Sequence, residues 1–148
     1  AGIALPVFLA LPIYMLHQYE EHDHNRFAEF LNGMMGPNAK GLSPADIWTI
    51  NVVFVWFLLL AVFYVASFAP GWGVLAAYLL AINGFVHMVW AAVFRNYNPG
   101  LWTSIALFLP LAIWMLAAVS ASIGTHVASA VLVILLHAAI MILARRPA

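Results

Sequence analysis

The sequence predicts an all-α integral membrane protein built as a bundle of five transmembrane helices. Of its 148 residues, 66% are hydrophobic and 7% are charged, and the mean hydropathy is +1.02. These values, with uncharged runs longer than a soluble core needs, are typical of membrane proteins. A helix needs roughly 20 apolar residues to cross a hydrocarbon core about 30 Å thick, and five such segments fit. We expect a single domain over residues 1–148.

The first helix is predicted over residues 3–31. Its apolar start has no preceding basic residues, so we interpret it as a membrane helix and not as a cleavable signal. It continues into the stretch LHQYEEHDH, residues 16–24, which gathers three histidines and three acids in nine positions. No other part of the chain is so rich in ionisable groups.

Turn signals separate the other four helices, which are predicted over residues 45–68, 72–94, 99–121 and 125–144. Ser43, Pro44 and Asp46 form a helix start, with a serine cap, a proline in the first turn and an acid near the positive end of the helix dipole. Ala69-Pro70-Gly71 and Asn98-Pro99-Gly100 mark the next two turns, and Gly124 precedes the last helix.

The basic residues predict the orientation. With five crossings, all of them fall on one side of the bundle: Arg26, Lys40, Arg95, Arg145 and Arg146. By the positive-inside rule this side is cytoplasmic, so the amino terminus is expected outside and the carboxyl terminus in the cytoplasm.

Charge and cysteine content exclude several classes of function. Five basic and five acidic residues give a formal net charge of zero, so we expect no nucleic-acid partner. The chain has no cysteine, which excludes disulfides, thiolate nucleophiles and iron–sulfur clusters. A metal ion would have to be held by nitrogen and oxygen ligands.

Polar residues are predicted to share one depth in the bundle. At about 1.5 Å of rise per residue, His17, His87 and His137 lie at a similar distance from the outer face. Asn51 and Thr103 reach the same level from the cytoplasmic side, and Asn83 precedes His87 by one helical turn. His126 lies nearer the outer end, where we expect an interhelical hydrogen bond.

One face of the first helix combines acids with imidazoles. His17, Glu20, Glu21 and His24 fall within an arc of about 100°, whereas His22 and Asp23 are expected to be solvated. Two carboxylates near hydrocarbon cost several kcal/mol unless protons, a cation or a paired base neutralise them. The alternative is a solvated helix end, with the acids paired to Arg26.

The Glu-x-x-His spacing of Glu21 and His24 is typical of carboxylate-bridged dimetal sites in helical bundles. We therefore predict one or two divalent transition metal ions, iron, manganese or zinc. The predicted ligands are His17, Glu20, Glu21, His87 and His137, with His24 as an additional candidate. Asn51, Asn83 and Thr103 would orient these ligands or contact substrate. Arg95 and Tyr97 would bind a lipid phosphate or anchor the helix end at the interface.

The same residues resemble the HXXEE family of small bacterial membrane proteins. The segment His17-Gln18-Tyr19-Glu20-Glu21 matches the motif, and residues 83–87 and 95–103 are similar to its later histidine and its Arg-x-Tyr-x-Pro-Gly-x-x-Thr segment. The resemblance supports His17, Glu20, Glu21 and His87 as functional residues. It implies a bacterial inner-membrane protein and no particular reaction.

The leading hypothesis is a membrane-embedded metal-dependent hydrolase or oxidoreductase that acts on a lipid-like or other hydrophobic substrate, with Glu20 or Glu21 as the base. One alternative is a transporter of protons or metal ions. Another is an accessory subunit of a membrane complex that binds haem through His87 and His137. Small residues in the fourth helix, among them Ala117 and Ala121, would allow packing against another copy or a larger complex.

Overall fold

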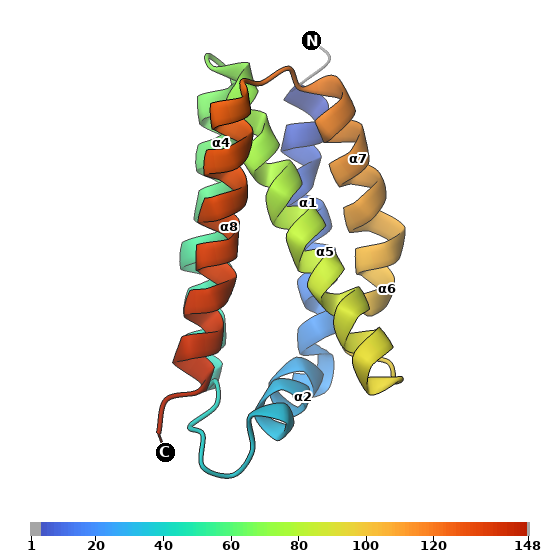
Figure 1. Cartoon of the computed structure of the whole chain (residues 1–148), viewed down its shortest axis with the longest axis vertical. Coiled ribbons are helices and arrows are strands. Elements are labelled where there is room, and N and C mark those ends of the chain that lie inside the picture. Colours follow the sequence, from blue (N-terminus) through green and yellow to red (C-terminus); the bar gives the residue numbers. More distant parts are fainter. Residues whose placement is uncertain (1–3, 148) are drawn as a thin grey trace.

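The helices of the described residues form five segments, most of which run roughly along the long axis of the molecule (Figure 1). The computed structural model describes residues 4–147. The first segment is α1 (Ala4–His22), which a short 3-10 turn, η1 (Asp23–Asn25), joins to α2 (Arg26–Met35). The second combines α3 (Pro44–Trp48), the π-helical η2 (Thr49–Trp56) and α4 (Phe57–Ala66).

The remaining three segments complete the bundle. The 3-10 turn η3 (Pro70–Gly73) leads into α5 (Val74–Phe94), which crosses the centre of the bundle (Figure 1). The fourth segment consists of α6 (Leu101–Thr103), the π-helical η4 (Ser104–Phe108) and α7 (Leu109–Ala118), and the fifth is α8 (Ile123–Ala144). The prediction of an all-α fold is confirmed for the described residues.

Four of these segments are long and apolar enough to cross a membrane: Pro44–Ala66, Pro70–Phe94, Leu101–Ala118 and Ile123–Ala144. They indicate a membrane protein. The predicted fifth span, α1, is not among them, because its last turns carry His17, Gln18, Glu20 and Glu21 among the apolar residues. The α1 helix nevertheless runs through the bundle beside α5 (Figure 1).

The predicted helix over residues 3–31 is interrupted. Ile3 lies outside the described residues, and the α-helix ends at His22. His24 and Asn25 have φ angles of 56° and 59°, a left-handed conformation that ends a right-handed helix and that asparagine tolerates better than most residues. The α2 helix therefore begins in a new direction, and His24 leaves the helical face that carries His17 and Glu21.

The start of the second segment agrees with the prediction. The Ser43 hydroxyl accepts a hydrogen bond from the backbone N–H of Asp46 at 3.2 Å, and the Asp46 carboxylate accepts one from the backbone N–H of Ser43 at 3.0 Å. These reciprocal bonds form a capping box. The sequence signal for a serine-capped helix with an early proline is thus confirmed.

Two apolar clusters lie on either side of the polar residues of α1. The larger joins α1, α4, α5 and α7 and includes Ala10, Leu59, Leu80 and Phe108. The smaller joins α2 to α8 through Leu31, Leu42 and Ala144. Along α1 and α5, the predicted ligands His17, Glu21 and His87 fall between residues of the first cluster and residues of the second.

Candidate metal centre

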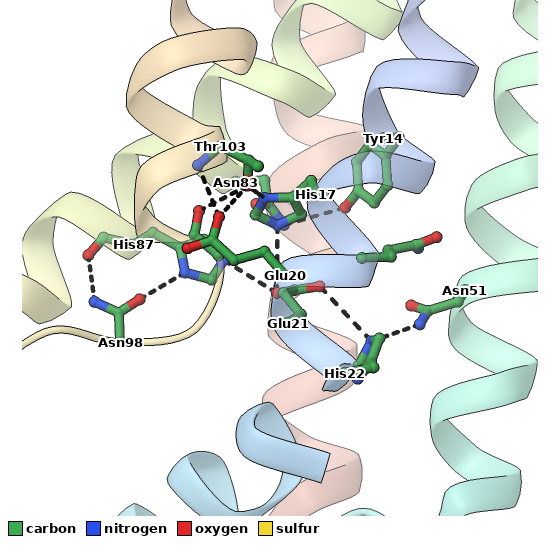
Figure 2. Close-up of polar contacts among 12 residues, drawn as sticks. Tyr14, His17, Glu20, Glu21, His22, Asn51, Asn83, His87, Asn98 and Thr103 are labelled. Carbon is green, nitrogen blue, oxygen red and sulfur yellow. Dashed lines mark hydrogen bonds and ion pairs between the residues drawn. The ribbon is translucent and has the colours of Figure 1, made fainter. Parts of the chain in front are cut away.

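Three predicted ligands converge in the interior of the bundle. His17, Glu21 and His87 each offer one ligand atom, and these atoms lie within 4.8 Å of one another. Glu21 Oε1 lies 3.3 Å from His17 Nε2 and 3.2 Å from His87 Nε2. The residues are only 0%, 5% and 2% exposed, respectively. Figure 2 shows the group between α1 and α5.

Thr103 determines which nitrogen of His17 carries hydrogen. The Thr103 hydroxyl donates its single hydrogen to Glu20 Oε2 at 2.6 Å, so its oxygen must accept from His17 Nδ1, 2.9 Å away. His17 Nδ1 is therefore the protonated nitrogen. In the neutral ring, Nε2 then carries only a lone pair, and this buried atom has no hydrogen-bond partner.

Asn98 fixes His87 in the same way. Its amide nitrogen donates to the backbone carbonyl of His87 at 2.9 Å, which leaves its oxygen facing His87 Nδ1 at 2.7 Å. An amide oxygen only accepts hydrogen bonds, so His87 Nδ1 carries the hydrogen. Asn98 is 1% exposed, and its two bonds hold both the backbone and the ring of His87 in place.

With hydrogen on Nδ1 of both His17 and His87, the buried charge of Glu21 needs compensation. The Nε2 lone pairs of two neutral imidazoles and an oxygen of a carboxylate would face one another in a buried site, where an uncompensated negative charge costs several kcal/mol. Positive charge must therefore lie among them, either as protons on the two rings or as a metal ion. Both Nε2 atoms lie within 3.3 Å of the same carboxylate oxygen, a separation that suits hydrogen bonds from protonated rings and also ligands that share one ion.

The turn after α5 packs directly on this group. Gly100 has a φ angle of +93°, and a Cβ atom there would lie 2.7 Å from Cε1 of both His17 and His87. Only glycine fits this position without displacing a ring. Asn98 and Gly100, which were predicted as parts of a turn and of the family-like segment 95–103, therefore both shape the site.

Glu20 lies outside the three-residue group. Its carboxylate accepts hydrogen bonds from the Tyr97 hydroxyl at 2.9 Å, from the backbone N–H groups of Trp102 and Thr103 at 3.1 and 2.8 Å, and from the Thr103 hydroxyl. Burial, with the bond to Glu20, raises the pKa of the Tyr97 phenol to about 12, so Tyr97 stays a donor at neutral pH. Glu20 thus caps the amino-terminal end of the helix that begins with α6.

Other predicted ligands have different partners. His137 Nδ1 bonds to the backbone carbonyl of Val133 at 2.9 Å, and the ring lies outside the three-residue group while it lines the adjacent cavity. The side chain of His24 is 86% exposed and contacts Asp23. Arg95 is exposed at the end of α5. Arg26, the predicted partner of the acids, pairs with Asp23 at 2.7 Å instead.

His22 was expected to be solvated, and the structure corrects this prediction. Its Nε2 lies 2.7 Å from the Asn51 amide nitrogen and 3.7 Å from Glu21 Oε2. The expectation failed because the helix ends at His22, which turns this side chain toward η2 and not toward solvent. His22 therefore extends the polar group into the bundle, and Asn51 contacts it as a predicted outer partner.

A cavity of about 380 Å³ adjoins the group. Glu21, His22 and His87 line one part of it, with Asn51, Asn83 and His137. The rest is apolar and formed by α2, α3, η2, α5 and α8, with Phe27 and Leu31 of α2 among the lining residues.

The predicted interhelical hydrogen bond of His126 is confirmed, since the Tyr78 hydroxyl lies 3.2 Å from its Nδ1.

A family model described as "Protein of unknown function with HXXEE motif" matches residues 8–115. The chain belongs to this HXXEE family. No curated protein and no solved structure matches the chain. The motif residues of the HXXEE family are His17, Glu20 and Glu21, two of which belong to the buried group while Glu20 positions Thr103. His87, Asn98 and Thr103 also lie within the matched range, and His137 lies beyond it.

Proposed function

We propose that His17, Glu21 and His87 hold one divalent transition metal ion, iron, manganese or zinc, and that the chain is a membrane-embedded metal-dependent enzyme. The observation that carries the proposal is the arrangement of three buried ligand atoms close enough together to hold one ion, which would compensate the charge of Glu21. Ligands about 2.0–2.2 Å from a zinc ion at tetrahedral angles lie about 3.3–3.6 Å apart. The two separations from Glu21 Oε1, 3.3 and 3.2 Å, are close to the lower end of this range.

The ligand set favours a catalytic site over a purely structural one. Two histidines and one carboxylate form the protein ligands of several zinc hydrolases and of non-haem iron oxygenases, both of which leave coordination positions for water or substrate. A bound ion of this kind activates water or dioxygen, or polarises a carbonyl. Thr103 and Asn98 would keep both imidazoles in the metal-binding tautomer, as outer hydrogen-bond partners commonly do.

The geometry favours one ion over two. A dinuclear site needs a bridging carboxylate and further carboxylate ligands, but both oxygens of Glu20 are hydrogen-bonded at the start of α6. Glu21 is the one acid of the described residues in the group. Glu20 is therefore assigned a positioning role in place of the predicted ligand and base.

We assign the role of base to His22. It is half-buried, lines the cavity beside Glu21 and His87, and has its Nε2 3.7 Å from the second oxygen of Glu21. Nε2 accepts a hydrogen bond from the Asn51 amide in the described structure, so the ring would take up a proton there when this bond is exchanged. The largely apolar cavity supports a hydrophobic, lipid-like substrate that enters from the bilayer.

Elemental analysis of the purified protein, before and after incubation with iron, manganese or zinc, tests the proposal. We expect about one ion per chain in the wild-type protein and a loss of at least tenfold in affinity in His87→Ala. His126→Ala is the matched control, because it removes a membrane histidine that bonds only to Tyr78 in the described structure. A wild-type protein that takes up no metal, or equal occupancy in the two variants, would contradict the metal site.

A further inference from the structure

The cavity beside the metal group is lined by apolar side chains and by fewer polar ones. The polar groups come from α1, η2, α5 and α8 and are Glu21, His22, Asn51, Asn83, His87 and His137. The apolar lining includes Leu31, Ile50, Val55, Ile134 and Met141. A volume of about 380 Å³ is at the lower end of the range for small-molecule pockets, roughly 300–1,000 Å³. A mostly apolar lining with a few polar groups suits an amphipathic molecule with one chain.

Asn83 provides a polar atom that the protein leaves unused. Its amide nitrogen donates to the Tyr14 hydroxyl at 3.1 Å, whereas its Oδ1 is buried without a hydrogen-bond partner. Asn83 precedes His87 by one turn of α5, so both side chains face the same cavity. An unpaired buried oxygen of this kind is destabilising, and a ligand that donates a hydrogen bond to it would remove this penalty.

Charge further restricts the ligand. Among the described residues that line the cavity, none is lysine or arginine. The acid in the lining, Glu21, already faces both metal-binding histidines. A phosphate or sulfate head group would therefore be buried without a basic partner, and a quaternary ammonium without a free acid, each at a high cost. An uncharged head group avoids both costs.

We propose that the substrate is a single-chain lipid with an uncharged head group that carries a hydroxyl, such as a long-chain alcohol. This inference deepens the proposed function and rests on it for the reacting atoms. The hydroxyl donates to Asn83 Oδ1, its oxygen faces the metal group of Glu21 and His87, and the chain lies along the apolar wall. A hydroxyl both donates and accepts, so it satisfies Asn83 in either orientation of the amide.

Fluorescence quenching by brominated lipids tests this proposal. The protein is placed in nanodiscs of uncharged phospholipid and titrated with ω-bromododecanol, ω-bromododecanoate and ω-bromododecyl phosphate. Trp90 lines the cavity, so Trp90→Phe identifies the part of the quenching that arises there. We expect the alcohol to bind at least tenfold more tightly than the phosphate. Asn83→Leu should weaken alcohol binding by roughly tenfold, whereas Asn96→Leu, at an exposed position, should leave it unchanged.

The outcomes separate this inference from the metal proposal when metal content is measured on the same samples. Preference for the alcohol in protein that holds no metal supports the binding inference while the metal proposal fails. A metal-loaded protein without Trp90-dependent preference for the alcohol overturns the inference alone. Preferential binding of the phosphate also overturns it, and would indicate a head group near Arg145, which lines a neighbouring hollow beyond Trp90 and Met141.

Discussion

Glu20 and Glu21 are neighbours in α1, but their carboxylates contact opposite kinds of partner. Glu20 accepts four hydrogen bonds from hydroxyl and backbone N–H groups of the segment around α6. Glu21 faces the Nε2 atoms of two histidines whose hydrogens are held elsewhere. Fixed donors of the protein thus compensate one negative charge, whereas the other needs a cation. Of these adjacent residues of one motif, Glu20 therefore caps a helix and Glu21 belongs to the proposed metal site.

The largest difference is expected between Glu21→Gln and Glu20→Gln. Glutamine at position 21 removes the charge that attracts the cation, so metal affinity should fall at least 100-fold, beyond the 10–100-fold typical of outer-shell changes. At position 20, one oxygen still accepts from Thr103, so we expect a loss of about 1–2 kcal/mol in stability, as for other helix caps, and at most a tenfold loss in metal affinity. Calorimetric metal titration measures the metal affinity of the two variants, and thermal unfolding measures their stability. Equal losses of affinity would show that the two carboxylates share one role.

Gly100→Ala should have the next largest effect, because the turn after α5 holds the ligands at their separation. Its Cβ would lie 2.7 Å from both imidazoles and 3.0 Å from Glu21 Cγ, at a φ angle of +93°. We expect a loss of about 2–5 kcal/mol in stability from strain and overpacking together, with weaker metal binding in the protein that folds. Gly36→Ala is the matched control, since φ is +82° but no atom lies within 4 Å of the new Cβ.

Thermal unfolding with and without metal separates the two contributions. Gly36→Ala should cost about 1–2 kcal/mol for the left-handed conformation, and metal should stabilise this variant as much as it stabilises the wild type. A Gly100→Ala protein with the stability and metal response of Gly36→Ala would mean that the turn does not pack against the ligands as described.

Asn98→Leu removes the acceptor that fixes the His87 tautomer and leaves the ligand itself in place. We expect metal affinity to fall by roughly 10–100-fold, the range for loss of an outer hydrogen-bond partner. Asn96→Leu is the control, because Asn96 is exposed and bonds to the backbone of Tyr97. Metal titration of the two variants distinguishes them, and an unchanged affinity in Asn98→Leu would remove the argument for a fixed tautomer at His87.

The sequence predicted the helical class, the turns and the grouping of three polar residues because each leaves a local signal. Long apolar runs indicate membrane helices, Ser43 and Asp46 form a recognisable cap, and His17 and Glu21 are four residues apart on one helical face. His87 was predicted from its depth in the bundle. All of these depend on regular helix geometry over a few turns.

The remaining features depend on departures from that geometry. The left-handed residues His24 and Asn25 end α1 earlier than predicted. As a result, the side chain of His24 lies away from the site, and the side chain of His22 lies beside it. Asn98 acts through a turn whose conformation no periodicity reveals. The sequence did not predict the capping contacts of Glu20, because they join it to a helix that is distant in sequence. The π-helical segments η2, which contains Asn51, and η4, which follows Thr103, likewise have no sequence signal.

Thr103 connects the two carboxylates, and its substitution should have the smallest of these effects on metal affinity. Thr103→Val removes the hydroxyl that donates to Glu20 and accepts from His17, so we expect a loss of roughly tenfold, at the lower end for an outer partner. Thr103→Ser keeps the hydroxyl and should bind metal like the wild type. If Glu20 influences the metal only through this hydroxyl, Glu20→Gln should not weaken metal binding any further in a Thr103→Val background. Additive losses in the double variant would instead mean that Glu20 acts on the buried group directly.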